Sequence, residues 1–210
     1  MTQRFYIFSI KLFRWQSGIL YQKREHTTHK INQLILTALF GSIIFVVNVF
    51  LPPPLNYVLI VVEAVLLALS GLFIRKVGAT YVGAVGGLLT AIGNPALGPF
   101  TFFFTLIFGI LVDAFMYIFR INGSREGVNR NRLMAVMAIS TMLIGIMSYS
   151  AFALFPQFIP FAKEFSGVGL FIQRSTMLDA MVLFMGPVTG IVAGYAASYL
   201  WNKYLRHILI

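Results

Sequence analysis

Apolar residues form six long runs along the chain, separated by short segments in which charged residues, prolines or glycines collect. A helix rises 1.5 Å per residue, so about 20 apolar residues cross the roughly 30 Å hydrocarbon core of a bilayer. Connections such as "PPPLN" and "GNPALGP" are short and rich in helix breakers, which favours antiparallel neighbours. The pattern therefore predicts six transmembrane helices, at residues 31–51, 55–75, 77–93, 98–119, 132–155 and 178–201.

Composition supports the membrane assignment. Of the 210 residues, 59% are hydrophobic and only 10% are charged, whereas an ordinary soluble domain carries about 25% charged residues. The net charge is +10, but the basic residues flank the apolar runs, so the membrane surface explains them better than nucleic acid does. The sequence thus predicts an all-α polytopic membrane protein that does not bind nucleic acid.

Lysine and arginine predict the orientation, because cytoplasmic loops carry an excess of both. With the N-terminus inside, the segments on the cytoplasmic side hold Arg4, Lys11, Arg14, Lys23, Arg24, Lys30, Arg75, Lys76, Arg120, Arg125, Arg130, Arg132, Lys203 and Arg206. The outer segments hold only Lys163 and Arg174. We therefore expect both termini in the cytoplasm and a multi-pass protein of the plasma membrane, with a transmembrane domain at 31–205.

Residues 1–30 form a separate, basic N-terminal segment. On a helix, Phe5, Phe8, Leu12 and Trp15 share one face, while the basic residues of that stretch share another. This pattern predicts an amphipathic helix on the inner leaflet, and a loosely ordered tail is an equal alternative. Lys11 and Arg14 interrupt the apolar core that a secretory signal would need.

Two of the runs carry small residues at every fourth position. They are Ala79, Gly83, Gly87 and Ala91 in the third run, and Gly186, Gly190, Gly194 and Ser198 in the last. Lipid gives no hydrophobic push between helices, so small residues that allow close backbone approach supply the packing. We interpret both stripes as helix-packing surfaces within the protein.

The first run has a looser version of the same device. Thr37 with Gly41 forms one face, and Ala38 with Ser42 forms another. These faces fit either internal packing or the docking of a partner protein.

Carboxylates are costly inside a bilayer and are functional candidates for that reason. Glu63 lies well inside the second run, and Asp113 lies near the end of the fourth. For Glu63 we expect a ligand-binding or proton-binding role in an internal cavity, with a carboxyl hydrogen-bonded to a neighbouring helix as the alternative. Asp113 fits either the floor of such a cavity or a pair with Arg120, and Asp179 fits a helix start or a pair with Arg174.

Further polar residues cluster near the outer ends of the first three runs, namely Asn48, Tyr57 and Asn94. Asn94 precedes a proline, so turn chemistry is its simpler explanation. The outer loop 156–177 is amphipathic and fits either an interfacial helix or a lid over an outward-facing cavity.

Several kinds of chemistry are poorly supported. The chain has no cysteine, and its histidines, His26, His29 and His207, all lie near the termini. It has no Gly-x-Ser-x-Gly, Walker A or His-Glu-x-x-His motif. We therefore expect no enzymatic activity, no metal site and no cofactor, and active transport would need a partner ATPase or an ion gradient.

Residues 75–115, "RKVGATYVGAVGGLLTAIGNPALGPFTFFFTLIFGILVDAF", resemble a known family of transport proteins. The stretch resembles the hydroxymethylpyrimidine- and thiamine-type S components, the substrate-binding subunits of energy-coupling-factor (ECF) transporters. The shared features are Lys76-x-Gly78-Ala79 before a small-residue helix, the turn glycines at 93 and 98, and Gly109 four residues before Asp113.

The resemblance implies a six-helix binder of a vitamin or vitamin precursor. Such a subunit docks, through small residues of its first helix, on a transmembrane coupling subunit that two ATPase subunits drive. In this reading, Glu63 holds an amino-pyrimidine or cationic ring, and aromatic residues stack on the ligand. The expected substrate-binding residues are Glu63, Asn48, Tyr57, Asn94, Phe100 and Asp113, and the expected docking residues are Thr37, Ala38, Gly41 and Ser42.

Two other functions fit the same sequence. One is a membrane scaffold or assembly subunit, whose small-residue faces bind other spans permanently. The other is an ion-gradient carrier, which ordinarily contains an inverted repeat; the glycine stripes of the third and sixth runs are the only hint of such symmetry.

Overall fold

The computed structural model describes residues 31, 33–50, 55–74, 77–93, 98–123, 126–154 and 176–207. The predicted amphipathic segment at 1–30 lies outside these residues. The chain divides into two compact units, Met1–Leu36 and Thr37–Ile210. In the first unit, the described residues 31 and 33–36 are helical. The following paragraphs concern the second unit, in which the regular elements formed by the described residues are all helices.

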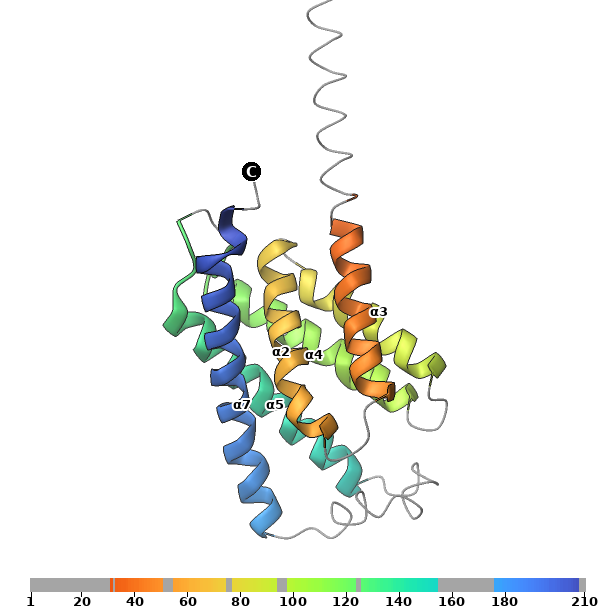
Figure 1. Cartoon of the computed structure of the whole chain (residues 1–210). Helices are drawn as coiled ribbons and strands as arrows, with labels where there is room; N and C mark the ends of the chain where they lie inside the picture. The colour runs from red at the N-terminus through yellow and green to blue at the C-terminus, as the bar shows by residue number, and fades with distance from the viewer. Residues whose placement is uncertain are drawn as a thin grey trace, which may run out of the picture. The chain divides into compact units, whose positions relative to one another are not determined.

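Each predicted apolar run coincides with a helix, and the ends differ by only a few residues. The helices are Gln33–Phe50, α2 (Leu55–Phe73), α3 (Gly78–Gly93), α4 (Gly98–Ile118), α5 (Arg130–Leu154) and α7 (Thr176–Lys203), followed by the short 3-10 helix η2 (Leu205–His207) (Figure 1). By length and composition, four of these helices can cross a membrane, within Gln33–Phe50, Gly98–Ile118, Arg130–Ala151 and Leu183–Lys203. Ile60–Phe73 and Gly78–Gly93 are shorter apolar stretches.

Large apolar side chains cover the outside of these helices. Phe50, Phe103 and Phe184 are 69%, 56% and 72% exposed, although burying such a side chain from water is worth roughly 1.5–3 kcal/mol. Exposed apolar surface of this extent is typical of a protein whose solvent is lipid. The apolar helices of the described residues and this exposed surface together indicate a membrane protein.

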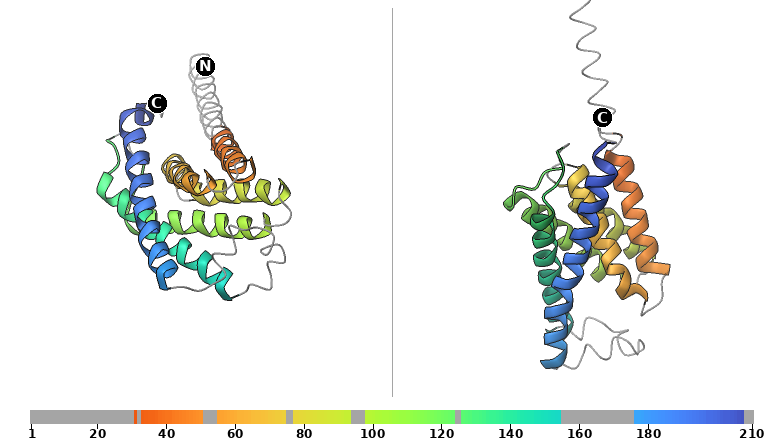
Figure 2. Two further views of the ribbon diagram at one scale, coloured as in Figure 1. Left: turned by 60° about the horizontal axis from the view of Figure 1, so that its bottom comes forward. Right: turned by 60° about the vertical axis from the view of Figure 1, so that its left-hand side comes forward.

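The helices α3 and α4 form a tightly packed antiparallel pair, and they lie side by side in Figure 2. A Cβ added at Gly83 would lie 2.6 Å from the Thr105 carbonyl oxygen, and one at Gly87 would lie 2.9 Å from the Phe102 Cα. The small-residue stripe of α3 therefore faces α4, and only glycine allows this approach of the two backbones.

The helices α5 and α7 form the second pair by the same device. A Cβ at Gly194 would lie 2.7 Å from the Met134 Cα, and one at Gly186 would lie 3.1 Å from the Met142 Cα. The Thr141 hydroxyl also donates a 2.7 Å hydrogen bond to the Gly186 carbonyl across the interface. Pro187 lies inside α7 directly after this carbonyl.

The helix α2 contacts both pairs and supplies much of the core. Ala64, Leu67 and Ala68 are fully buried, and Leu72 is nearly so. Trp201 of α7 is also fully buried, with its ring 4.9 Å from that of Phe73 at the end of α2. The apolar core therefore runs along α2 and joins the two helix pairs.

Three separate segments meet at one end of this unit. The backbone at Gly123, in the connection from α4 to α5, lies against the Leu72 carbonyl and the Trp201 ring. In the same connection, Val128 donates a 2.8 Å hydrogen bond from its backbone N–H to Asn202 Oδ1, and its carbonyl accepts a 3.1 Å bond from Asn202 Nδ2. The C-terminal ends of α2 and α7 and the α4–α5 connection thus lie on the same side.

Candidate functional site: a polar cluster between three helices

Glu63 is an ionisable residue within an apolar helix. It lies eight residues after the start of α2, about 12 Å along the helix axis. Its neighbours in sequence are Val62, which is exposed, and Ala64, which is fully buried. An ionisable side chain at such a position faces the interior or a polar cavity in nearly all membrane proteins.

The Glu63 carboxyl faces polar side chains from two other helices. Asn48 of the Gln33–Phe50 helix and Thr105 of α4 lie at hydrogen-bonding range of it. The Asn48 Nδ2 atom is buried and makes no well-formed hydrogen bond, so the approach to Glu63 is not a closed pair. We call Asn48, Glu63 and Thr105 the polar cluster.

Small residues bring these three side chains together. A Cβ at Gly41 would lie 2.7 Å from Val85 Cγ1, and one at Gly86 would lie 2.9 Å from Ile44 Cγ2. These contacts hold the Asn48 helix against α3, while Gly83 holds α3 against α4 at Thr105. Close packing at these glycines therefore fixes the positions of the helices that carry the three polar side chains.

Asp113 is engaged elsewhere, at the N-terminal end of α3. Its carboxylate accepts hydrogen bonds from the Ala79 N–H at 3.1 Å, the Thr80 N–H at 2.7 Å and the Thr80 hydroxyl at 2.7 Å. The first N–H groups of a helix have no partner within the helix, and a carboxylate there also suits the helix dipole. Asp113 thus caps α3 from α4, a role that the sequence analysis did not consider.

The structure does not join the other predicted substrate-binding residues into one site. The side chain of Tyr57 in α2, all of Asn94 and residues 156–175 of the outer loop lie outside the described part of the chain. Phe100 is partly buried in the first turn of α4. It lies five residues before Thr105, about 7.5 Å along the helix axis.

The two small-residue faces of the first helix differ in burial. Thr37 and Gly41 are buried, and Gly41 packs on α3. Ala38 and Ser42 are exposed, and the Ser42 hydroxyl donates a 2.7 Å hydrogen bond to the Ala38 carbonyl within the helix. Only the Ala38–Ser42 face is therefore open to a partner.

The sequence analysis missed a second group of residues, near the end of α7. Tyr195, Tyr199, Asn202, Lys203 and Arg206 line a cavity there with Arg130 of α5. Their three- and four-residue spacing places them on one helix face, and this periodicity was the signal in the sequence. The sequence analysis uses only the basic residues among them, as indicators of orientation.

Within the described residues, no group of three or more histidine, cysteine, aspartate or glutamate side chains is arranged to hold a metal ion. The polar cluster has one carboxyl, one amide and one hydroxyl, which suits hydrogen bonding to a neutral or cationic organic group. In comparisons with family models, curated proteins and solved structures, the chain matches none of them at a significant level.

Proposed function

We propose that the protein is the substrate-binding S component of an ECF-type importer, and that it takes up a vitamin or vitamin precursor of the hydroxymethylpyrimidine or thiamine type. In this proposal it catalyses no reaction and needs no cofactor. It lies in the plasma membrane with six spans and with both termini in the cytoplasm.

The polar cluster carries this proposal. A buried amide nitrogen without a well-formed hydrogen bond costs about 1–3 kcal/mol, and such a group in a folded protein calls for an explanation. Asn48 Nδ2 is such a group, and it lies beside the one carboxyl that enters the interior from α2. A ligand with a ring nitrogen and an exocyclic amine would accept from Asn48 and donate to Glu63.

The position of the cluster fits entry from outside. Asn48 lies two residues before the end of its helix, Thr105 lies seven residues after the start of α4, and Glu63 lies near the middle of α2. The cluster is therefore displaced from the end where the basic residues of the α4–α5 connection and α7 gather. If that basic end is cytoplasmic, the ligand reaches Glu63 from the outer surface. Asp113, whose oxygens are occupied by α3, would then hold the helices rather than the ligand.

Uptake would also need partners, because the chain has no nucleotide-binding motif. The exposed Ala38–Ser42 face is the surface that we assign to a transmembrane coupling subunit, which ATPase subunits would drive. Small residues on an exposed face permit close approach of a second helix.

The first test is native mass spectrometry of the detergent-purified protein, to detect a small molecule that co-purifies. Hydroxymethylpyrimidine and thiamine are then added to ligand-free protein, and the shift in thermal unfolding temperature is measured. A retained or stabilising pyrimidine would support the proposal. If no small molecule co-purifies and neither compound shifts the unfolding temperature, the proposed substrate class is contradicted. That outcome would favour the alternative function of a membrane scaffold or assembly subunit.

The residue-level test is the Glu63→Gln variant. Glutamine keeps the length of the side chain but replaces one acceptor oxygen with an NH2 donor and cannot ionise, so we expect ligand affinity to fall by about tenfold or more. Glu126→Gln is the matched control, since Glu126 is exposed in the α4–α5 connection; its affinity should stay unchanged. Equal affinity for wild type and Glu63→Gln would remove Glu63 from the site.

A further inference from the structure

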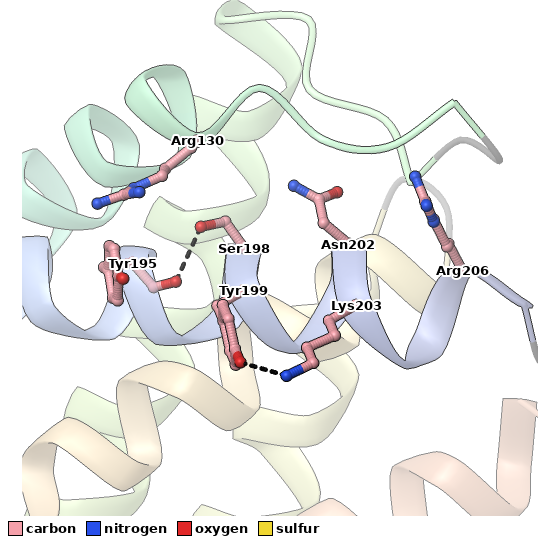
Figure 3. Close-up of a pocket in the computed structure, with 7 residues that line it drawn as sticks. All are labelled: Arg130, Tyr195, Ser198, Tyr199, Asn202, Lys203 and Arg206. Carbon is pink, nitrogen blue, oxygen red and sulfur yellow. Dashed lines mark hydrogen bonds between the residues drawn. The ribbon is translucent and has the colours of Figure 1, made fainter.

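A cavity of about 440 Å³ lies where α5 begins and α7 ends. Arg130, the first residue of α5, forms one wall, and the last turns of α7 with Arg206 form the other. Figure 3 shows the side chains that line it. Three of the lining residues are cationic, and none is acidic.

Tyrosine rings hold two of the cations in place. The Arg130 guanidinium carbon lies 3.8 Å from the centre of the Tyr195 ring, and Figure 3 shows the two side chains stacked. Stacking uses the flat face of the guanidinium and leaves its N–H donors at the edge. The Lys203 ammonium donates a 2.7 Å hydrogen bond to the Tyr199 hydroxyl and lies 5.2 Å from the centres of the Tyr199 and Tyr204 rings.

The two walls are also tied to each other. Asn202 lines the cavity, and its side-chain amide pairs with the backbone N–H and carbonyl of Val128, two residues before α5 begins. Gly127 adopts φ 104°, which a side chain would strain, and lies against Asn202 Oδ1. The cations therefore project from a fixed frame rather than from loose ends of the chain.

From this geometry we propose that the cavity is a phosphate-binding site, and that it takes the headgroup of an anionic phospholipid. The cavity lining gathers guanidinium and ammonium groups and contains no acidic residue, and such groups together suit phosphate oxygens. The site would hold one lipid at the junction of α5 and α7.

The position of the cavity relative to the membrane favours a lipid as the source of the phosphate. Arg130 begins one helix that can cross a membrane, and Lys203 ends another. The ends of such helices lie at the level of the phospholipid headgroups, where tyrosines and basic residues collect. Basic pockets between helices on the cytoplasmic side of a membrane bind anionic headgroups, and the charge pattern predicts that side for this cavity.

The test compares lipid binding by the delipidated full-length protein, measured by native mass spectrometry with phosphatidylglycerol and with phosphatidylcholine. We expect wild type to prefer phosphatidylglycerol, and the Arg130→Gln/Lys203→Gln variant to bind it roughly thirty-fold more weakly. Arg132→Gln is the matched control, since Arg132 is exposed in the same turn of α5 and does not line the cavity; its affinity should change less than twofold.

Competition with inorganic phosphate distinguishes a lipid headgroup from a free phosphate compound as the bound anion. Displacement of phosphatidylglycerol only at high millimolar phosphate would assign the site to the lipid, whereas displacement at micromolar phosphate would assign it to a free phosphate compound. If the double variant does not fold, Lys203→Gln alone, at an exposed side chain, should weaken lipid binding about fivefold. Equal binding by wild type and the folded cavity variants, or an equal loss in Arg132→Gln, would overturn the proposal.

Discussion

Two carboxylates that look alike in the sequence have different surroundings in the structure. Asp113 accepts three hydrogen bonds from α3, which use both of its oxygens. Glu63 faces an amide and a hydroxyl without forming a closed network. A carboxylate whose two oxygens are filled by donors from the first turn of a helix is suited to structure. A carboxyl beside a buried amide nitrogen that lacks a well-formed hydrogen bond is better suited to a ligand.

Substitution of Asp113 should therefore lower stability rather than affinity. Asp113→Ala leaves two N–H groups of α3 without partners in a buried position, and we expect a loss of about 1–3 kcal/mol. The readout is the thermal unfolding temperature in detergent. Thr80→Val, which removes only the hydroxyl donor, should cost less.

Ligand affinity of the folded Asp113→Ala fraction separates the two roles. Unchanged affinity would fit the capping role, and so would a fall in unfolding temperature. An unaltered unfolding temperature with lost binding would instead return Asp113 to the ligand site.

At the level of helices, glycines decide which helices can pair closely. The same residue type meets different neighbours: a Cβ at Gly83 meets the Thr105 carbonyl oxygen at 2.6 Å, and one at Gly71 meets the Met116 sulfur at 2.7 Å. A backbone atom in a packed helix cannot move aside, whereas the end of a methionine side chain can. The kind of neighbouring atom, rather than its distance, thus determines how much stability is lost when each glycine is replaced.

Gly83→Ala and Gly71→Ala form a matched pair that tests this difference. We expect Gly83→Ala to lower the free energy of unfolding by about 1–3 kcal/mol, since α3 and α4 must separate. Gly71→Ala should change it by less than about 0.5 kcal/mol, because alanine favours the helix and Met116 can adjust. Unfolding of both variants by denaturant in detergent gives the comparison, and equal losses would refute the close packing of α3 on α4.

The helices themselves were predictable, because long apolar runs bounded by breakers leave few alternatives. The stripes were also visible as a four-residue repeat, but the sequence did not identify their partners: Gly41 and Gly86 face each other across two helices. The capping of α3 by Asp113 and the pairing of Asn202 with Val128 join residues far apart in the chain. Contacts of that kind follow from the packing as a whole and leave no local pattern.

For the whole molecule, the gathering of basic residues at one end is the feature that predicts its orientation. The α4–α5 connection and the end of α7 are held together by Val128 and Asn202, and the end of α2 lies against them at Gly123. Arg120, Arg130 and Lys203 therefore share one side, although they belong to separate segments. An end with so many cations resists transfer across a bilayer, which favours a cytoplasmic location.

Single-cysteine labelling measures this orientation directly, because the chain has no cysteine to remove. Glu126→Cys and Tyr204→Cys replace exposed side chains at the basic end, so a membrane-impermeant maleimide should label them only after the cells are permeabilised. Lys163→Cys, on the side that the charge pattern assigns to the exterior, should label in intact cells. Labelling of Glu126→Cys in intact cells would reverse the orientation and place the polar cluster nearer the cytoplasm. An importer could not then take up its ligand at Glu63, whereas the cavity at the junction of α5 and α7 would still lie at the level of the headgroups, in the opposite leaflet.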